Sequence, residues 1–388
     1  MGSRIATIAP VVVNVSPKTN WTFIAVTTTD GTTGVGECSL NGWEPLLAAY
    51  CAMLAPQARE CPLDATDALL RYVPHSPGGL VAHAVKSALE QALASLRASA
   101  AGTSVARALD PKARTSVPAY ANINRGVTER SPAGFADAAR RAVAAGYRAV
   151  KLAPFDGVIA EDAAHTPIDA RTRDGLDRVY AVRDAVGGAI DVMVDCHWRF
   201  DAPRAEALLR DIEAARPYWV ECMTTEHPAG FAAIARLTAL AHERGTRTAG
   251  GETIAGADAA QAMCAAGLYN VLMPDIKYAG GFSGMLAIAR VCAAHGVSFA
   301  PHNPTGPIAH VASIHACAAA PAALILEHQW NESPLFASLV SDSLPPLVDG
   351  AFVVPTVPGL GVALDDAVVR AHPGRPLPRD ANLDERLG

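Results

Sequence analysis

Six polar residues recur along the second half of the chain, each directly after a short apolar run. The intervals between them are 26, 31, 23, 27 and 25 residues. A polar side chain that closes an apolar strand at such regular intervals indicates successive βα units. The carboxyl ends of parallel strands share one rim of a barrel, and catalytic groups are placed there. We therefore expect one pocket to be formed by Asp195, Glu221, Glu252, Asp275, His302 and Glu327.

Alternation of strands and helices begins at Val117 and continues for about 210 residues. Eight strands over that length fit a closed parallel α/β barrel. An open doubly wound sheet is the alternative, but it needs a Gly-rich phosphate turn after its first strand, and residues 121–126 (ANINRG) do not form one. The expected strands are 117–121, 148–152, 190–195, 217–221, 247–251, 269–273, 297–300 and 323–327.

The first part of the chain has a different pattern. Strands are expected at 4–14 and 21–37, with a hairpin turn at Asp30-Gly31, and helices at 43–59, 64–72 and 78–99. After residue 330 the barrel pattern stops and short strands and turns follow. We expect residues 1–115 to form an α+β capping domain, residues 116–335 the catalytic barrel, and residues 336–388 a C-terminal segment that packs back on the cap.

Composition excludes several classes of partner. The net charge is −6 and no basic block occurs, so neither nucleic acid nor an anionic membrane is expected as a partner. The eight cysteines show no CxxC spacing, and the first ten residues contain no long apolar run. We therefore expect reduced thiols and a cytoplasmic protein without a signal peptide. The most apolar stretch, 310–326, is interrupted by His315 and is interpreted as a buried helix and strand.

Three successive strand-end carboxylates predict a metal site. Asp195, Glu221 and Glu252 would repel one another unless a cation lay between them. Oxygen ligands suit a hard divalent ion, and Mg²⁺ keeps positions open for substrate oxygens. The alternative is three unrelated acids that form local salt bridges.

Two histidines are candidate proton carriers. A carboxylate that holds an imidazole raises its basicity, so Asp275 and His302 on neighbouring strands predict a general base. His197 lies two residues beyond Asp195, and strand residues i and i+2 share a side. It is a candidate general acid in the same pocket. Alternatively, each histidine is structural.

Three further residues are candidates for the same pocket. Lys151 ends the second barrel strand and could stabilise an oxyanion, or it is an ordinary rim lysine. Glu327 could bond an enolic oxygen or pair with a cation. Lys277 could reach the pocket or cap a helix. A divalent ion, a lysine and an acid around one carboxylate would stabilise an enediolate, so that an imidazole could remove the α-proton.

Over nearly its whole length the chain resembles the mandelate racemase-like branch of the enolase superfamily. The resemblance is carried by VDCHWR, VE, GGE, PDIKYAGG, APHNPTGPIAH and ILEHQW. It implies an α/β fold, a modified TIM barrel (β/α)₇β with an N-terminal α+β capping domain. It also implies Mg²⁺ on Asp195, Glu221 and Glu252, and commonly a homo-oligomer.

Within that branch, Asp-Cys-His at 195–197 and PHNPTGPIA are similar to sugar-acid dehydratases of the galactonate or mannonate kind. This resemblance implies that His302 takes the α-proton and His197 expels the β-hydroxyl. The usual second lysine of Lys-x-Lys is Ala153 here, which disfavours a two-base racemase. Glu221-Cys222-Met223 also departs from the common Glu-Glu-Pro.

Substrate contacts are expected from the cap loops 39–44 and 75–80, with Trp43, Trp198, Trp330 and Lys277 as candidate contacts. The leading hypothesis is an Mg²⁺-dependent sugar-acid dehydratase. The alternatives are a racemase, epimerase or cycloisomerase of the same superfamily, a Schiff-base aldolase that uses Lys151 or Lys277, and a non-catalytic binder.

Overall fold

A three-stranded antiparallel sheet opens the chain in the computed structural model. The central strand β2 (Thr19–Thr28) pairs with β1 (Ile5–Ser16) and with β3 (Thr33–Glu37). The predicted hairpin turn is confirmed: Gly31 has a φ of 85°, and its N–H donates to the Thr28 carbonyl over 2.9 Å. The structure describes residues 3–72, 79–158 and 168–376.

Helices cover this sheet and complete what we call the cap, β1–β3 with α1–α4. Helix α3 lies directly against β3, where an added Cβ at Gly36 would overlap the backbone of Ala88. The glycine therefore permits the close approach of strand and helix. The helices are α1 (Glu44–Ala58), α2 (Thr66–Tyr72), α3 (Gly79–Ala100) and α4 (Val105–Leu109).

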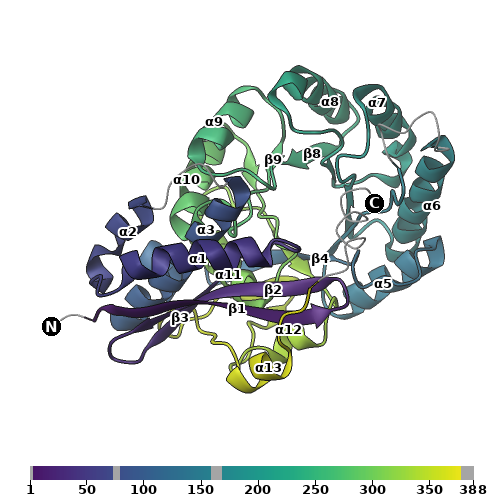
Figure 1. Cartoon of the computed structure of the whole chain (residues 1–388). Helices are drawn as coiled ribbons and strands as arrows, with labels where there is room; N and C mark the ends of the chain where they lie inside the picture. The colour runs from purple at the N-terminus through teal and green to yellow at the C-terminus, as the bar shows by residue number, and fades with distance from the viewer. Residues whose placement is uncertain (1–2, 73–78, 159–167, 377–388) are drawn as a thin grey trace.

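Eight parallel strands then alternate with seven helices in the described part of the chain (Figure 1). The last strand pairs with the first, Leu326 opposite Ala119, so the sheet closes into a barrel and the open-sheet alternative is wrong. The strands are β4 (Ser116–Asn122), β5 (Ala149–Leu152), β6 (Asp191–Asp195), β7 (Trp219–Glu221), β8 (Arg247–Gly250), β9 (Val271–Leu272), β10 (Ser298–Phe299) and β11 (Leu326–Gln329).

The helices surround the barrel and follow the strands in order. None of the described helices combines the length and the apolar character that a membrane span requires. They are α5 (Pro132–Ala144), α6 (Ile168–Val186), α7 (Ala202–Asp211), α8 (Phe231–Glu243), α9 (Ala257–Ala265), α10 (Gly281–Ala294) and α11 (Pro307–Ala319).

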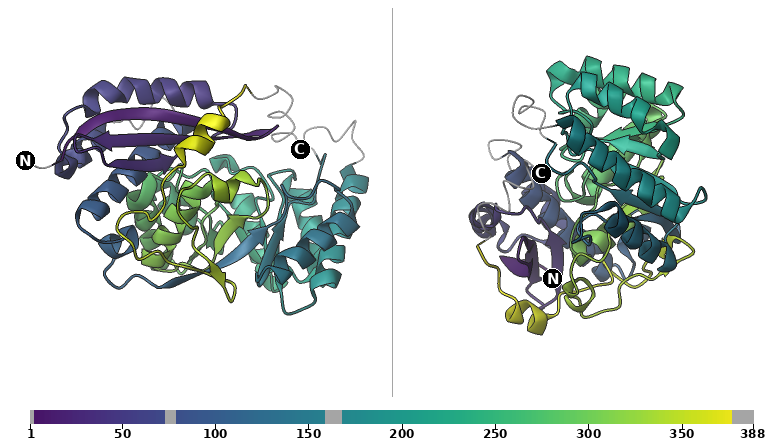
Figure 2. Two further views of the ribbon diagram at one scale, coloured as in Figure 1. Left: turned by 90° about the horizontal axis from the view of Figure 1, so that it is seen from below. Right: turned by 90° about the vertical axis from the view of Figure 1, so that its right-hand side faces the viewer.

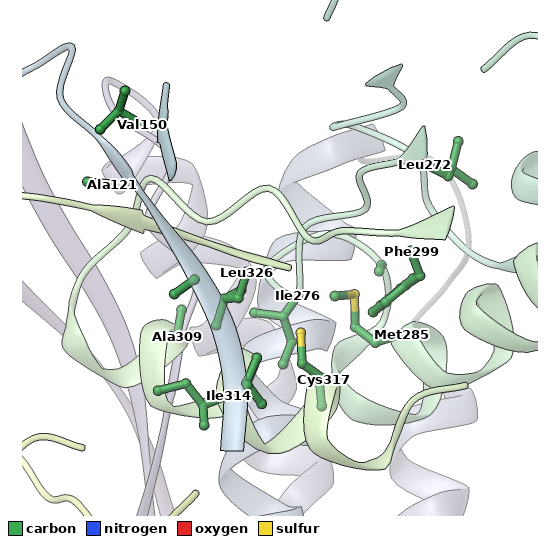
Figure 3. Packing of buried hydrophobic residues seen from close by; sticks show 14 of the residues in the cluster. Ala121, Val150, Leu272, Ile276, Met285, Phe299, Ala309, Ile314, Cys317 and Leu326 are labelled. Carbon is green, nitrogen blue, oxygen red and sulfur yellow. The ribbon is translucent and has the colours of Figure 1, made fainter. Parts of the chain in front are cut away.

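Alternating strand residues divide the core into two layers. Tyr120, Met193 and Trp219 belong to a buried cluster inside the barrel, and residues in or next to seven of the strands contribute to it. This cluster is separate from the one between the strands and the surrounding helices. Their neighbours in sequence pack against the helices instead, because successive side chains of a strand point to opposite faces. Figure 3 shows part of this outer layer, where Phe299 and Leu326 lie among side chains of α10 and α11.

The chain after β11 contacts both the barrel and the cap. It contains α12 (Leu335–Ser338), β12 (Leu347–Val348), β13 (Ala351–Val353) and α13 (Asp366–Ala371), and β13 pairs antiparallel with the start of β4. The Asn14 N–H donates to the His372 carbonyl over 3.0 Å, which ties the segment to β1. Figure 2 shows the cap across one end of the barrel, with α13 beside its strands.

Candidate active site

The polar strand-end residues continue the inward-facing rows of the barrel. Tyr120 is followed two residues later by Asn122, and Met193 in the same way by Asp195. Because the side-chain period of a strand is two, these polar groups lie on the barrel's inner face, above its apolar filling. The strand periodicity therefore accounts for their convergence.

A cavity of about 450 Å³ lies between the cap and these strand ends. It has room for a sugar acid, since small-molecule pockets are about 300 to 1,000 Å³. Both the cap and the barrel contribute to its wall. The lining residues are Thr19, Trp21, Ser39, Leu40, Asn41, Trp43, Asn122, Asn124, Arg125, Lys151, Asp195, His197, Trp198, Glu252, Lys277, Tyr278, His302 and Pro304.

His302 is held by Asp275, as expected for a base. Its Nδ1 lies 2.9 Å from Asp275 Oδ2, and its Nε2 lies 3.4 Å from Glu252 Oε2. Lys277 Nζ shares the same Asp275 oxygen at 3.1 Å. Burial alone would raise the pKa of Asp275, but Lys277 and His302 outweigh it, so the carboxyl is held ionised. An ionised Asp275 favours the His302 tautomer that leaves Nε2 available to accept a proton.

His197 reaches the cavity in a way that differs from the expected one. Strand β6 ends at Asp195, and His197 and Trp198 have left-handed backbone conformations, with φ of 47° and 56°. The assumption that His197 continues the strand was therefore wrong. The turn nevertheless brings His197 Nε2 to 2.8 Å from Asp195 Oδ2, and the His197 N–H donates to Oδ1, also over 2.8 Å.

Lys151 lies deep in the barrel between two carboxylates. Its Nζ is 2.6 Å from Glu221 Oε1 and 2.9 Å from Glu327 Oε1, and all three side chains are buried. Burial would lower the pKa of Lys151, but the two carboxylates outweigh it and raise the pKa well above its usual value. A permanently charged amine cannot attack a carbonyl, which disfavours the Schiff-base hypothesis for Lys151.

Glu327 accepts hydrogen bonds through both carboxylate oxygens, and Lys151 and His302 lower its pKa although burial would raise it. Asn122 Nδ2 donates to its Oε1 over 2.7 Å, and the Asn303 N–H donates to its Oε2 over 2.8 Å. Of the two roles considered for Glu327, the observed contact is the pairing with a cation. Sequence reasoning missed Asn303, whose position directly after His302 was the available signal.

A group that could hold a metal lies beside the two histidines. Asp195, Cys222 and Glu252 each offer one ligand atom, and these atoms lie within 4.8 Å of one another. The predicted third ligand, Glu221, is instead turned toward Lys151 and the Trp219 indole N–H. The ligand role of Glu221 stays a prediction.

The donor set fits a hard divalent cation. Burial raises the pKa of Glu252 to about 8, and repulsion from Asp195 acts in the same direction. Lys151 and His197 offset these effects only in part, so Glu252 lacks full compensation by positive charge, whereas Asp195 has His197 beside it and its pKa is lowered. Cys222 donates to Glu252 Oε1 over 3.5 Å, and burial raises the pKa of its thiol, so the carboxylates are the better ligands for a hard ion.

Two of the three tryptophans predicted as substrate contacts line the cavity. Trp43, which is 37% exposed, and Trp198 line the cavity. Trp330 packs against the hydrophobic core instead, and it is not one of the described residues that line the cavity. Residues 39–41 of the expected cap loop also line the cavity, whereas 75–78 of the second loop lie outside the described part of the chain.

Glu226 is a further, half-buried carboxylate that sequence reasoning missed. It accepts from the Gly251 N–H over 2.7 Å and from the Tyr269 hydroxyl over 2.8 Å, and it also bonds the Trp198 side chain. These bonds hold the backbone next to Glu252 and the turn after His197. It lies five residues beyond Glu221, past the end of its strand, where strand-end spacing gives no signal.

Known proteins resemble this chain in sequence. Residues 134–368, which are 235 of 388, match the family described as Enolase C-terminal domain-like. The D-gluconate dehydratase of Thermoproteus tenax is 31% identical over 75% of this chain, and the match spans 56% of that relative. The D-galactonate dehydratase of Xanthomonas oryzae pv. oryzae (strain PXO99A) is 28% identical over 92% of each chain.

Solved structures resemble it in fold. A mandelate racemase/muconate lactonizing enzyme from Jannaschia sp. CCS1 is 26% identical, with a TM-score of 0.85 over 96% of this chain and 98% of that one. A mandelate racemase/muconate lactonizing enzyme-like protein from Roseovarius sp. TM1035 shares the fold, with a TM-score of 0.83, 24% identity and 96% of each chain covered. The chain therefore belongs to the enolase C-terminal domain-like family, as its mandelate racemase-like motifs predicted.

Proposed function

We propose that the protein is an Mg²⁺-dependent dehydratase of a sugar acid, a hydro-lyase. The observation that carries the proposal is that His302 and His197 line one cavity, with the carboxylates Asp195 and Glu252 beside them. The relatives named D-gluconate and D-galactonate dehydratase support the same substrate class.

In the proposed reaction, His302 Nε2 removes the proton α to the substrate carboxylate, and Asp275 stabilises the resulting imidazolium. His197 delivers a proton to the β-hydroxyl, which leaves as water, and the enol product tautomerises to a 2-keto acid. Lys151 contributes fixed positive charge near the carboxylate end of the substrate.

Mg²⁺ would be held by Asp195 and Glu252, with Glu221 as the predicted third ligand. It would supply positive charge to the substrate carboxylate, which makes the α-proton more acidic. We further propose a cytoplasmic homo-oligomer, as expected from the scattered cysteines and from the family resemblance.

The test is a library of mono- and diacid sugars with Mg²⁺, in which 2-keto acid is detected with semicarbazide. Loss of a general acid or base costs about 10²- to 10⁴-fold in rate. His302→Asn should lose both keto acid and exchange of the α-hydrogen with solvent deuterium. His197→Asn should lose keto acid but keep the exchange, and EDTA should abolish both.

His242→Asn serves as a control, because His242 is an exposed histidine on α8. It should leave both assays unchanged. Keto acid formation that persists in His302→Asn would refute the proposal. Deuterium exchange without keto acid in the wild type would favour the isomerase alternative instead.

A further inference from the structure

Two carboxylates of the cap lie buried against the barrel. Glu37, at the end of β3, is 0% exposed, and Glu90, within α3, is 3% exposed. Buried carboxylates are uncommon unless they are bonded, because desolvation of a charge is costly. The proposed reaction assigns neither of them a role.

Glu37 receives donors from the chain segment that follows His302. Thr305 Oγ1 donates to its Oε1 over 2.6 Å and the Gly306 N–H over 2.8 Å, and the Ala309 N–H donates to its Oε2 over 3.0 Å. The last two groups belong to the first turn of the 13-residue helix α11 or its N-cap, where negative charge is favourable. Glu37 therefore fixes the far end of the four-residue connection from His302.

Glu90 makes the equivalent contact on the neighbouring strand connection. The Phe282 N–H donates to its Oε2 over 2.7 Å, and the Ser283 N–H and hydroxyl donate to its Oε1 over 3.2 and 2.7 Å. These groups open helix α10, which follows the segment carrying Asp275. Gly281, with φ of 67°, leaves the space, since an added Cβ there would overlap Glu90.

Gln91 links the two contacts. It exchanges hydrogen bonds with the backbone of Glu37, over 3.1 and 3.2 Å, and its Nε2 also lies 3.5 Å from the carbonyl of Ile276. Ile276 lies between Asp275 and Lys277. One side-chain network of the cap therefore contacts both connections that bear the His302–Asp275 pair.

We propose that Glu37 and Glu90 are positioning residues, through which the cap sets the separation and orientation of His302 and Asp275. This inference rests on the proposed function for its catalytic consequence. Each carboxylate provides two acceptor oxygens to three or more donors. An amide has one acceptor, and its NH₂ would face a backbone N–H, so Glu→Gln should loosen the connection without a change of volume.

The experiment compares Glu37→Gln and Glu90→Gln with Asp365→Asn. Asp365 is a matched control, because its carboxylate also caps a helix, accepting from the Ala367 and Val368 N–H groups of α13. All measurements are made well below each unfolding midpoint. A misplaced base typically costs up to about 100-fold in rate. We expect at least about 10-fold lower kcat and α-deuterium exchange in both Gln variants, with KM and Mg²⁺ half-saturation within about twofold.

A spectroscopic readout makes the test independent of turnover. With ¹⁵N-histidine labelling, the Nδ1–H signal of His302 is assigned by its loss in His302→Asn. It should shift or broaden in the two Gln variants and stay unchanged in Asp365→Asn. If the wild type acts on no library acid, the proposed function fails, and this signal alone decides the positioning role.

Two less disruptive variants at Thr305 keep the inference testable if a Gln variant does not fold. Thr305→Val removes one donor to Glu37, whereas Thr305→Ser keeps the hydroxyl, so only the valine variant should slow exchange and alter the His302 signal. The inference is overturned if the Gln variants lose thermal stability while exchange per folded molecule and the His302 signal match the wild type. Glu37 and Glu90 would then only stabilise the cap on the barrel.

Discussion

At the scale of residues, Lys151 is kept charged by two buried carboxylates. Its ammonium compensates both Glu221 and Glu327 in the barrel interior. Lys151→Met would leave two buried carboxylates without a cation, and removal of one partner of a buried pair costs about 3–5 kcal/mol. Urea unfolding should show a loss of this size in the free energy of unfolding. Lys112→Met, at an exposed lysine, should change it little, and an equally small change for Lys151→Met would contradict the prediction.

Lys277 tests the isomerase alternative, because it is the obvious candidate for a second base. Burial would lower the pKa of Lys277, but Asp275 outweighs it and raises the pKa, so the amine stays protonated. We therefore expect no limb in the pH profile from Lys277 between about pH 6 and 9. Lys277→Met should slow α-hydrogen exchange without abolishing it. Abolished exchange in this variant, together with exchange that survives in His302→Asn, would identify Lys277 as the base.

At the scale of elements, helix α11 carries a histidine that is fixed in its neutral form. His315 Nδ1 accepts from the Ala106 N–H of α4 over 3.1 Å, and Nε2 donates to the Leu360 carbonyl over 2.9 Å. Burial lowers its pKa to about 4. One imidazole therefore joins a barrel helix, the cap and the C-terminal segment, and protonation would break its bond to α4.

The low pKa of His315 predicts that the protein becomes less stable as the pH falls. Because the folded pKa of His315 is below the unfolded value, its stabilisation is present above about pH 6.5 and is lost as pH falls toward 4. The unfolded histidine is only half protonated at pH 6.5, so the slope stays below its full value of 1.36 kcal/mol per pH unit there, and the loss between pH 6.5 and 4.5 amounts to about 2 kcal/mol. Urea unfolding of His315→Gln should show a pH dependence weaker by about this amount.

His242→Gln, at an exposed histidine, is the control for this measurement and should follow the wild type. His328 contributes with the same sign, since burial lowers its pKa to about 4 as well. The comparison of wild type with His315→Gln isolates the contribution of one histidine. Equal pH dependence in the two proteins would contradict the prediction.

At the scale of the whole molecule, a metal ion bound by the cavity carboxylates would couple metal binding to folding. A ligand of the folded state stabilises it by about 2.7 kcal/mol at one hundred times its Kd. Mg²⁺ should therefore raise the unfolding midpoint by several degrees, and EDTA should reverse the change. Asp195→Asn should remove the response. Asp191→Asn, at the opposite end of strand β6, should keep it, and a retained response in Asp195→Asn would contradict the assigned site.

The sequence by itself determined the barrel and the rim residues. Spacing placed Asp195, Asp275 and His302 at strand ends, and strand periodicity turned the side chains before them inward. Both are properties of a few consecutive residues, so they can be read without knowing what lies opposite. The eight strands appeared where they were expected, although β9 and β10 are only two residues long.

Only the tertiary structure decided which partners these side chains take. Glu221 faces Lys151, which belongs to a strand two places away in the barrel. His197 reaches the cavity through a left-handed turn that strand geometry does not predict. Glu37 contacts Thr305 across 268 residues of chain. The choice among hydrogen-bond partners depends on atoms supplied by distant segments and on their burial, which local periodicity does not encode.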